Sequence, residues 1–226
     1  MTQPRLPQID PRLVPVTGVD SHMPPVDPTR LDPQALRQRF AQPPVWQPEL
    51  LAEKKFMERA PMHAAVLIPI VMRPEPTVIL TQRTEHLSTH SGQIAFPGGK
   101  LDEADADASA AALREAFEEV GLPADFVDVL GQMPLYTTGS AFLVTPVVAL
   151  VRPGFTLKPN PHEVTDVFEV PLSFLMNPAH HRHHQLQWQG AQRQWLSMPY
   201  QEGHTQRFIW GATAGMLRNF YRFLMA

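Results

Sequence analysis

The chain contains no cysteine, which excludes disulfides and metal sites built from thiolates and suits a reducing compartment. No apolar run approaches the roughly 20 residues that a membrane-spanning helix requires. The opening residues, MTQPRLPQIDPRLVPV, also lack the apolar segment of a secretory signal peptide. We therefore expect a cytoplasmic protein with no membrane partner.

The sequence has little net charge of either sign. Its 19 lysine and arginine residues and its 22 aspartate and glutamate residues give a formal net charge of −3. A protein that binds nucleic acid usually carries a strongly basic surface, and this composition does not supply one. We therefore expect a small molecule as the partner, and no nucleic acid.

Three segments are distinguished by their composition. Eleven of the 25 prolines lie in the first 50 residues, so residues 1–30 are expected to form an extended or disordered arm. Residues 31–60 are expected to form an N-terminal helical extension, in which Asp32 caps a short helix that begins at Pro33. This extension can pack on the main domain or on the second subunit of a homodimer. Residues 61–226 are long enough for one catalytic domain.

Strand patterns dominate the main domain. The runs AAVLIPIVM and TVILTQR, joined by the turn RPEP, predict a pair of strands. Two long helical patterns follow, at about 106–120 and 211–225. Such a mixture predicts an α/β or α+β sandwich. Further strands or extended segments are expected at 126–130, 141–151, 164–170, 185–189 and 192–198.

The helix at about 106–120 carries a cluster of acids. Helical spacing places Glu115, Glu118 and Glu119 roughly opposite the apolar Leu113, Phe117 and Val120. A solvated charged face is the ordinary explanation. However, two glutamates four residues apart repel each other by ~0.2–0.5 kcal/mol, and a cation would relieve this repulsion. Mg²⁺ prefers carboxylate oxygens and often bridges to phosphates, so the cluster also fits a site for a metal-bound phosphate ester.

The same residues belong to a recognisable motif. Gly99 followed by the unbroken segment REAFEEVGL, from Arg114 to Leu122, resembles the Nudix box. The spacer is one residue longer than in the general box, so its first acidic position falls on Asp105 or is displaced onto Ala106.

The extra residue and the preceding segment are similar to the coenzyme A pyrophosphatase branch of Nudix hydrolases. That branch has a signature that is matched here by LTQR at 80–83, Leu87, His90 and GQIAFPGG at 92–99. Shorter similarities, such as IWGAT at 209–213, extend the resemblance from about residue 60 to the C-terminus.

The resemblance implies both a fold and a reaction. The fold is the Nudix α/β/α sandwich with a mixed sheet between helices. The reaction is metal-dependent hydrolysis, with Mg²⁺ or Mn²⁺, of coenzyme A or an acyl-CoA to 3′,5′-ADP and 4′-phosphopantetheine or its acylated form. One alternative is hydrolysis of another nucleoside diphosphate, such as ADP-ribose or a dinucleotide. A second is a ligand-binding module without turnover, although such modules usually lose a box carboxylate and this chain retains three.

The resemblance also assigns roles to residues. The metal ligands would be Glu115 and Glu119, with Glu118 nearby and the carbonyl of Gly98 completing the shell. Arg114 would orient Glu115 or Glu119. The proton of the attacking water would pass to a box glutamate or to Glu163, which can also be read as an exposed residue before a strand.

Substrate contacts are expected along the upstream signature. The candidates are cationic side chains that could contact the phosphates and residues that could shape the substrate loop. Each cation could instead simply be a solvated surface residue, and a phenylalanine could simply pack in the core. These residues are Arg83, His90, Gly92, Gln93, Phe96 and Lys100.

The histidine-rich run AHHRHH at 179–184 does not have the spacing of a typical metal site. We expect a polar loop or an exposed strand flank there. Met216, Phe220 and Phe223 repeat at helical spacing and are expected to pack in the core.

Overall fold

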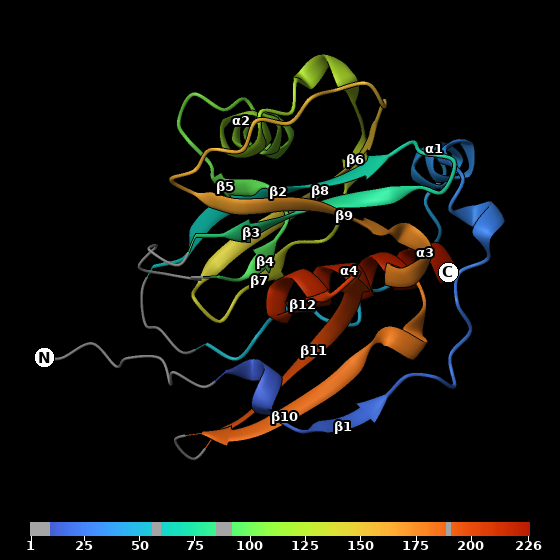
Figure 1. Cartoon of the computed structure of the whole chain (residues 1–226), viewed down its shortest axis with the longest axis vertical. Coiled ribbons are helices and arrows are strands. Elements are labelled where there is room, and N and C mark those ends of the chain that lie inside the picture. The colour runs from blue at the N-terminus through green and yellow to red at the C-terminus, as the bar shows by residue number, and fades with distance from the viewer. Residues whose placement is uncertain (1–9, 56–59, 85–91, 189–190) are drawn as a thin grey trace, which may run out of the picture.

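A computed structural model describes residues 10–55, 60–84, 92–188 and 191–226 of the chain (Figure 1). The strands are β1 (Val16–Val19), β2 (Met62–Val71), β3 (Thr77–Arg83), β4 (Ile94–Ala95), β5 (Gly98–Lys100), β6 (Val127–Gln132), β7 (Tyr136–Thr137), β8 (Phe142–Val151), β9 (Val164–Pro171), β10 (Arg182–Trp188), β11 (Ala191–Glu202) and β12 (Thr205–Trp210). The helices are α1 (Pro33–Ala41), α2 (Ala108–Val120), α3 (Leu172–Leu175) and α4 (Gly211–Met225), with short 3₁₀ helices η1 (Pro11–Leu13), η2 (Pro28–Arg30), η3 (Ala124–Phe126) and η4 (Pro178–His180).

The main sheet has eight strands and is mixed. Its central pair, β2 and β8, is parallel, and the other pairs are antiparallel. The order is β4-β3-β2-β8-β6, with β5 paired to β2, β7 to β8 and β9 to β3. Helix α2 covers one face, and α4 covers the other (Figure 1). The predicted α/β/α sandwich with a mixed sheet is therefore confirmed.

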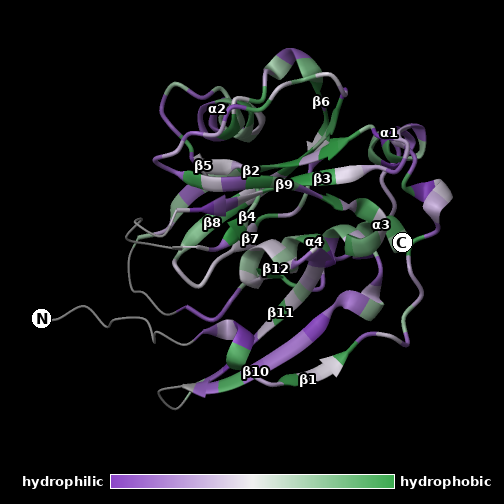
Figure 2. Ribbon diagram, viewed as in Figure 1, coloured by the Kyte–Doolittle hydropathy of each residue, from purple (hydrophilic) through white to green (hydrophobic). Residues whose placement is uncertain are grey.

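Alternation along β2 explains how one strand contributes to two cores. Ala65 and Leu67 pack in the cluster that includes α2, whereas Ile68 and Ile70 pack in the cluster that includes α4. Successive side chains of a strand point to opposite faces, so a strand that is apolar throughout is buried on both sides. Figure 2 shows hydrophobic residues along the main sheet and α4, whereas β10 is largely hydrophilic.

A second, smaller sheet lies on the other side of α4 (Figure 1). It is antiparallel, in the order β1-β10-β11-β12. Arg207 of β12 ties it to the main sheet, because its guanidinium donates to Asp166 at 2.6 Å and lies 4.1 Å from the centre of the Phe168 ring. Helix α4 is thus enclosed between two sheets, and Leu217 and Phe220 are fully buried.

The N-terminal segment packs on its own chain. The start of α1 agrees with the prediction, since Asp32 accepts a hydrogen bond from the amide of Gln34 and Pro33 is the first helical residue. The alternative of a disordered arm is wrong for residues 10–30, because β1 pairs with β10 and Asp20 forms a 2.9 Å ion pair with Arg218. That these segments cover a second subunit stays a prediction.

For the histidine-rich run the expectation of a polar loop is wrong, and the alternative of an exposed strand flank holds only in part. The run forms η4 and the start of β10, and His181 and His184 are buried. His181 donates from Nε2 to the Leu175 carbonyl at 2.8 Å and accepts at Nδ1 from Arg218 at 3.1 Å. Both nitrogens of His184 are also bonded. Burial is tolerated because each ring is fully hydrogen-bonded, and these partners are distant in sequence.

The buried His181 makes stability depend on pH. Burial lowers its pKa from 6.5 to about 4, and the positive charge of Arg218 acts in the same direction. Between these values the unfolded chain binds the proton and the folded chain does not, so the free energy of unfolding falls as the pH falls from about 6.5 to about 4. The expected loss is about 3 kcal/mol at about 1.4 kcal/mol per pH unit.

Denaturant unfolding at pH 7 and pH 4.5 measures this effect. His181→Asn is expected to be less stable at pH 7 but to lose less stability on acidification. The exposed control His204→Gln should keep the wild-type pH dependence. An unchanged pH dependence in His181→Asn would contradict the assignment.

Candidate active site

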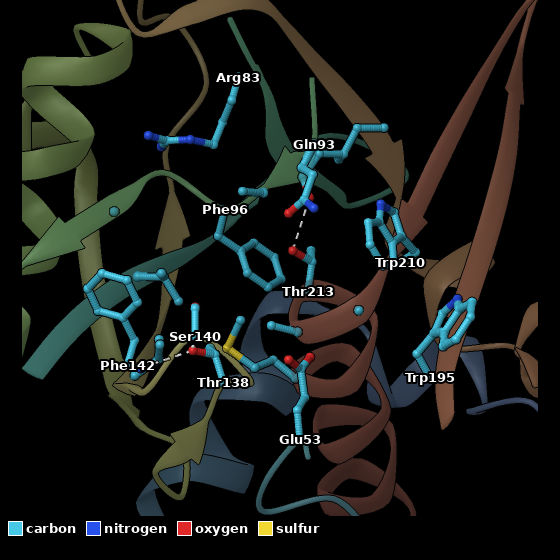
Figure 3. Close-up of a pocket in the computed structure, with 18 of the residues that line it drawn as sticks. Glu53, Arg83, Gln93, Phe96, Thr138, Ser140, Phe142, Trp195, Trp210 and Thr213 are labelled. Atoms are coloured by element: carbon cyan, nitrogen blue, oxygen red, sulfur yellow. Dashed lines mark hydrogen bonds between the residues drawn. The ribbon is translucent and has the colours of Figure 1, made fainter. Parts of the chain in front are cut away.

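A cavity of about 1160 Å³ opens between the box region and the small sheet. Its wall includes β5, α2 and the end of β3 on one side, and β10, β11 and β12 on the other. Figure 3 shows Arg83 on one side of this cavity and Trp195 and Trp210 on the other. The volume is slightly above the range for small-molecule pockets, which is roughly 300–1000 Å³.

Helix α2 carries the box acids and has well-defined ends. Asp107 caps its start by accepting a 2.8 Å hydrogen bond from the amide of Ala110. Gly121 ends it with a φ of 68°, a left-handed conformation that glycine adopts without strain. These caps fix where α2 begins and ends.

The orientation of α2 differs from the expected one. Phe117 is 60% exposed, whereas Glu119 is 2% exposed and faces inward. The buried face instead consists of small residues such as Ala112 and Ala116 together with Val120, which allow the helix to approach the sheet closely. Glu119 tolerates burial because its carboxylate has partners.

Both oxygens of Glu119 are hydrogen-bonded. Arg83 donates to one from Nη1 at 3.2 Å, and the amide of Gly98 donates to the other at 3.1 Å. Burial raises the pKa of Glu119 to about 7, and the charges of Glu115 and Glu163 add to this effect. A carboxylate with a pKa near 7 is suited to exchange protons at neutral pH.

Glu115 lies against the backbone of β5, one helical turn before Glu119. A Cβ atom on Gly99 would come closer than 3.0 Å to its carboxylate, so this approach requires glycine. Burial also raises the pKa of Glu115, while the hydrogen bond from Arg114 at 3.0 Å acts against the increase. The glycine at position 99 of β5 therefore makes room for a carboxylate at the cavity wall.

Arg114 is the centre of an ionic cluster. Its guanidinium donates to both oxygens of Asp105 at 3.0 and 2.9 Å and also to Glu115 and Glu118 at 3.0 Å. Of the two residues that it was expected to orient, it therefore contacts Glu115, whereas Arg83 contacts Glu119. The side chain of Glu118 is 53% exposed.

A loop before β9 brings Glu163 to the box. The amide of Asn160 donates to the Glu119 carbonyl at 2.8 Å, and the Asn160 side chain donates to the Glu163 carboxylate at 3.3 Å. Glu163 lines the cavity, and its charge raises the pKa of both Glu115 and Glu119. Three carboxylates therefore share one side of the cavity.

Most of the remaining residues that were expected to bind substrate or metal lie at the cavity. Gly92, Gln93, Gly98 and Lys100 line the cavity. Phe96 also reaches its wall but is only 2% exposed and belongs to the core. His90 lies outside the described residues.

Sequence reasoning missed three residues of the opposite wall, namely Glu53, Trp195 and Trp210. The alternating pattern around Trp195 indicated a strand, but it did not show which face of that strand lines the cavity. Glu53 has no local signal, because a parallel bridge between Ala52 and Thr137 brings it to the cavity from the N-terminal extension.

The carboxylates of α2 have the chemistry of a site for a divalent metal ion. Within the described ranges, no three acidic or histidine side chains form a preassembled metal site. Mg²⁺ does not require one, since it usually binds one or two carboxylates, several waters and the substrate phosphates. Glu115 and Glu119 provide two carboxylates at the cavity wall, and the missing side chain of Gly99 lets the Glu115 carboxylate lie against β5. The donor set therefore fits this ion.

The sequence of this chain is similar to that of a known protein family. A family model described as the NUDIX domain matches residues 61–194. The chain belongs to the Nudix hydrolase family. Members of this family generally use divalent metal ions such as Mg²⁺ or Mn²⁺ and bind nucleotide substrates. In the described part of this Nudix chain, no helix is long and apolar enough to cross a membrane.

Relatives of this Nudix protein include "Uncharacterized Nudix hydrolase NudL" of Escherichia coli strain K12, which is 45% identical over 157 residues, or 69% of this chain and 79% of the relative. Among solved structures, the Nudix hydrolase RenU of M. smegmatis is 25% identical, with a TM-score of 0.43 over 51% of this chain and 73% of that chain. A C. elegans Ap4A hydrolase is 20% identical, with a TM-score of 0.43 over 52% of this chain and 85% of that chain.

Proposed function

We propose that this Nudix protein hydrolyses the diphosphate of coenzyme A or an acyl-CoA, giving 3′,5′-ADP and 4′-phosphopantetheine or its acylated form. The observation that carries the hydrolysis is a pair of carboxylates, the partly buried Glu115 and the buried Glu119, at the wall of a cavity of about 1160 Å³. The choice of coenzyme A is supported by the similarity of residues 80–99 to the coenzyme A branch.

The proposed metal site consists of Glu115, Glu119 and the carbonyl of Gly98, with Glu118 nearby. A bound Mg²⁺ or Mn²⁺ supplies positive charge that stabilises the negative charge developing on the diphosphate and makes a water more acidic. Arg114 holds Glu115 in position through its 3.0 Å hydrogen bond.

The chain itself supplies the proton acceptor and the phosphate contacts. As the water oxygen bonds to phosphorus and the bond to the leaving phosphate breaks, the proton passes to Glu163 or to Glu119. Arg83 bonds Glu119 through one nitrogen, and a guanidinium has five N–H donors, so it can also contact a phosphate. Lys100 and the loop residues Gly92 and Gln93 line the space in which the substrate would lie.

Another nucleoside diphosphate, such as ADP-ribose or a dinucleotide, is the alternative substrate. It uses the same carboxylates and differs only in what fills the rest of the cavity. We place this reaction in the cytoplasm, and the homodimer stays a prediction.

A substrate panel tests the proposal. The protein is incubated with coenzyme A, acetyl-CoA, ADP-ribose, NADH and a nucleoside triphosphate, each with Mg²⁺ or Mn²⁺, and the products are identified by mass spectrometry. We expect 3′,5′-ADP from the two coenzyme A compounds at rates at least tenfold above the others. Turnover of another compound would keep the chemistry and reject the substrate. Metal-dependent binding without any product would favour a binding module.

A further inference from the structure

The small sheet presents an aromatic face to the cavity. In β11 and β12, Trp195 lies two residues before Ser197, and Ser197 pairs with Trp210, so the two tryptophans are diagonal neighbours on one face. Their rings are 6.3 Å apart at 67°. Phe208 of β12 and Leu186 of β10 also line the cavity. Aromatic surface that is left partly uncovered in a cavity is typical of small-molecule sites.

A carboxylate from the N-terminal extension lies at the same end of the cavity. Glu53 accepts hydrogen bonds from the amide of Gly139 at 2.8 Å and from the hydroxyl of Tyr136 at 3.4 Å, and its carboxylate points into the cavity (Figure 3). Burial raises its pKa, and the charge of Arg193 on β11 acts in the opposite direction. Glu53 therefore offers a fixed hydrogen-bond acceptor beside the aromatic face.

The aromatic face also holds a hydrogen-bond donor. The indole nitrogen of Trp195 is buried and has no hydrogen-bond partner among the residues that the structure describes. A buried donor without a partner is unfavourable, and a hydrogen-bond acceptor on a ligand would remove this penalty. This end of the cavity thus combines apolar rings, one acceptor and one donor.

We infer that Trp195, Trp210 and Glu53 form a subsite for the uncharged, amide-bearing arm of the substrate. This inference rests on the proposed function, in which the arm is pantetheine. Two amides supply both an N–H group for Glu53 and a carbonyl for the Trp195 indole, and the alkyl segments suit the rings. The nucleotide half carries an additional phosphate, which the Glu53 carboxylate would repel.

On this account, the diphosphate lies at the box, where Arg83 and Lys100 also line the cavity. The small sheet then determines which group beyond the diphosphate is accepted. Its function is to select the substrate, whereas the box carries out the reaction.

Direct binding of the two halves of coenzyme A tests the subsite without requiring turnover. Pantetheine and adenosine 3′,5′-bisphosphate are titrated by calorimetry into the wild type, Glu53→Gln and Trp195→Leu. We expect both variants to weaken pantetheine binding at least fivefold and to change bisphosphate binding less than twofold. Glu53→Gln preserves size, so its result stands even if Trp195→Leu disturbs the small sheet. Glu75→Gln, in the exposed turn before β3, is the matched carboxylate control.

If the two variants lose bisphosphate binding and keep pantetheine binding, Glu53 and Trp195 contact the nucleotide half of coenzyme A, and the inference is overturned. Unchanged binding of both halves would give Glu53 and Trp195 a structural role only and would also overturn the inference.

Turnover separates this inference from the proposed function. If coenzyme A is cleaved while the variants bind pantetheine normally, only the subsite fails. If coenzyme A is not cleaved while the variants lose pantetheine binding, only the proposed reaction fails.

Discussion

Glu119→Gln is expected to lower the turnover of the best substrate by at least about a thousandfold. The substitution keeps the size of the side chain but removes the negative charge that would hold a divalent ion. It also removes a group that can accept a proton, since glutamine does not titrate. Removing an interaction that stabilises the transition state lowers kcat and kcat/KM together. Steady-state kinetics with saturating Mg²⁺ and with saturating Mn²⁺ measures the loss.

The stability of this variant should stay close to that of the wild type. A neutral side chain at position 119 avoids the desolvation of a buried charge and the repulsion from Glu115 and Glu163. It also loses the ion pair with Arg83 and one of the two acceptor oxygens, which acts in the opposite direction. Thermal melting should therefore show a midpoint close to that of the wild type in the absence of metal. Glu75→Gln should match the wild type in rate and melting. If Glu119→Gln retained wild-type turnover, the acids would form only a charged surface.

Gly99→Ala is expected to lower turnover by about a hundredfold, although it removes no chemical group. The new methyl group would occupy the space of the Glu115 carboxylate, and the flexible end of that side chain would move away. Displacing a catalytic group by about 1 Å can reduce a rate by roughly two orders of magnitude. Kinetics and the apparent affinity for Mn²⁺ should both deteriorate, while the melting temperature stays close to that of the wild type.

Gly18→Ala is the control for this substitution. Among the residues that the structure describes, its added Cβ would lie within 4 Å of His183 alone, at 3.9 Å, and the site is far from α2 in the sequence. Its turnover should equal that of the wild type. A Gly99→Ala variant with normal kinetics would show that the position of Glu115 beside β5 does not matter for the reaction.

The sequence was sufficient to locate α2 and its carboxylates, because these depend on local spacing. Glutamates four residues apart on a capped helix face the same way, and Gly121 marks the end of the helix. The same periodicity gives the wrong exposure for Phe117, which is exposed, and for Glu119, which is buried. A polar side chain can be buried when it finds hydrogen-bond partners, and those of Glu119 come from β3 and β5, which are distant in sequence.

Features that depend on distant partners could not be predicted. His181 is buried because Arg218 and the Leu175 carbonyl meet its ring, and nothing near it in the sequence indicates this. Glu53 reaches the cavity only because its segment pairs with Thr137. The strand that carries Trp210 was missed because its first residues, TQR, are polar and exposed for the most part.

The central claim is that water attacks a phosphorus of a coenzyme A compound at the box carboxylates. Hydrolysis of coenzyme A with Mg²⁺ in water enriched in ¹⁸O, followed by mass spectrometry of both products, tests it most directly. The account predicts 3′,5′-ADP and 4′-phosphopantetheine, one ¹⁸O atom in only one of the two products, and no reaction when a chelator removes the metal. Absence of these products, cleavage without ¹⁸O, or cleavage that continues in the presence of the chelator would contradict it.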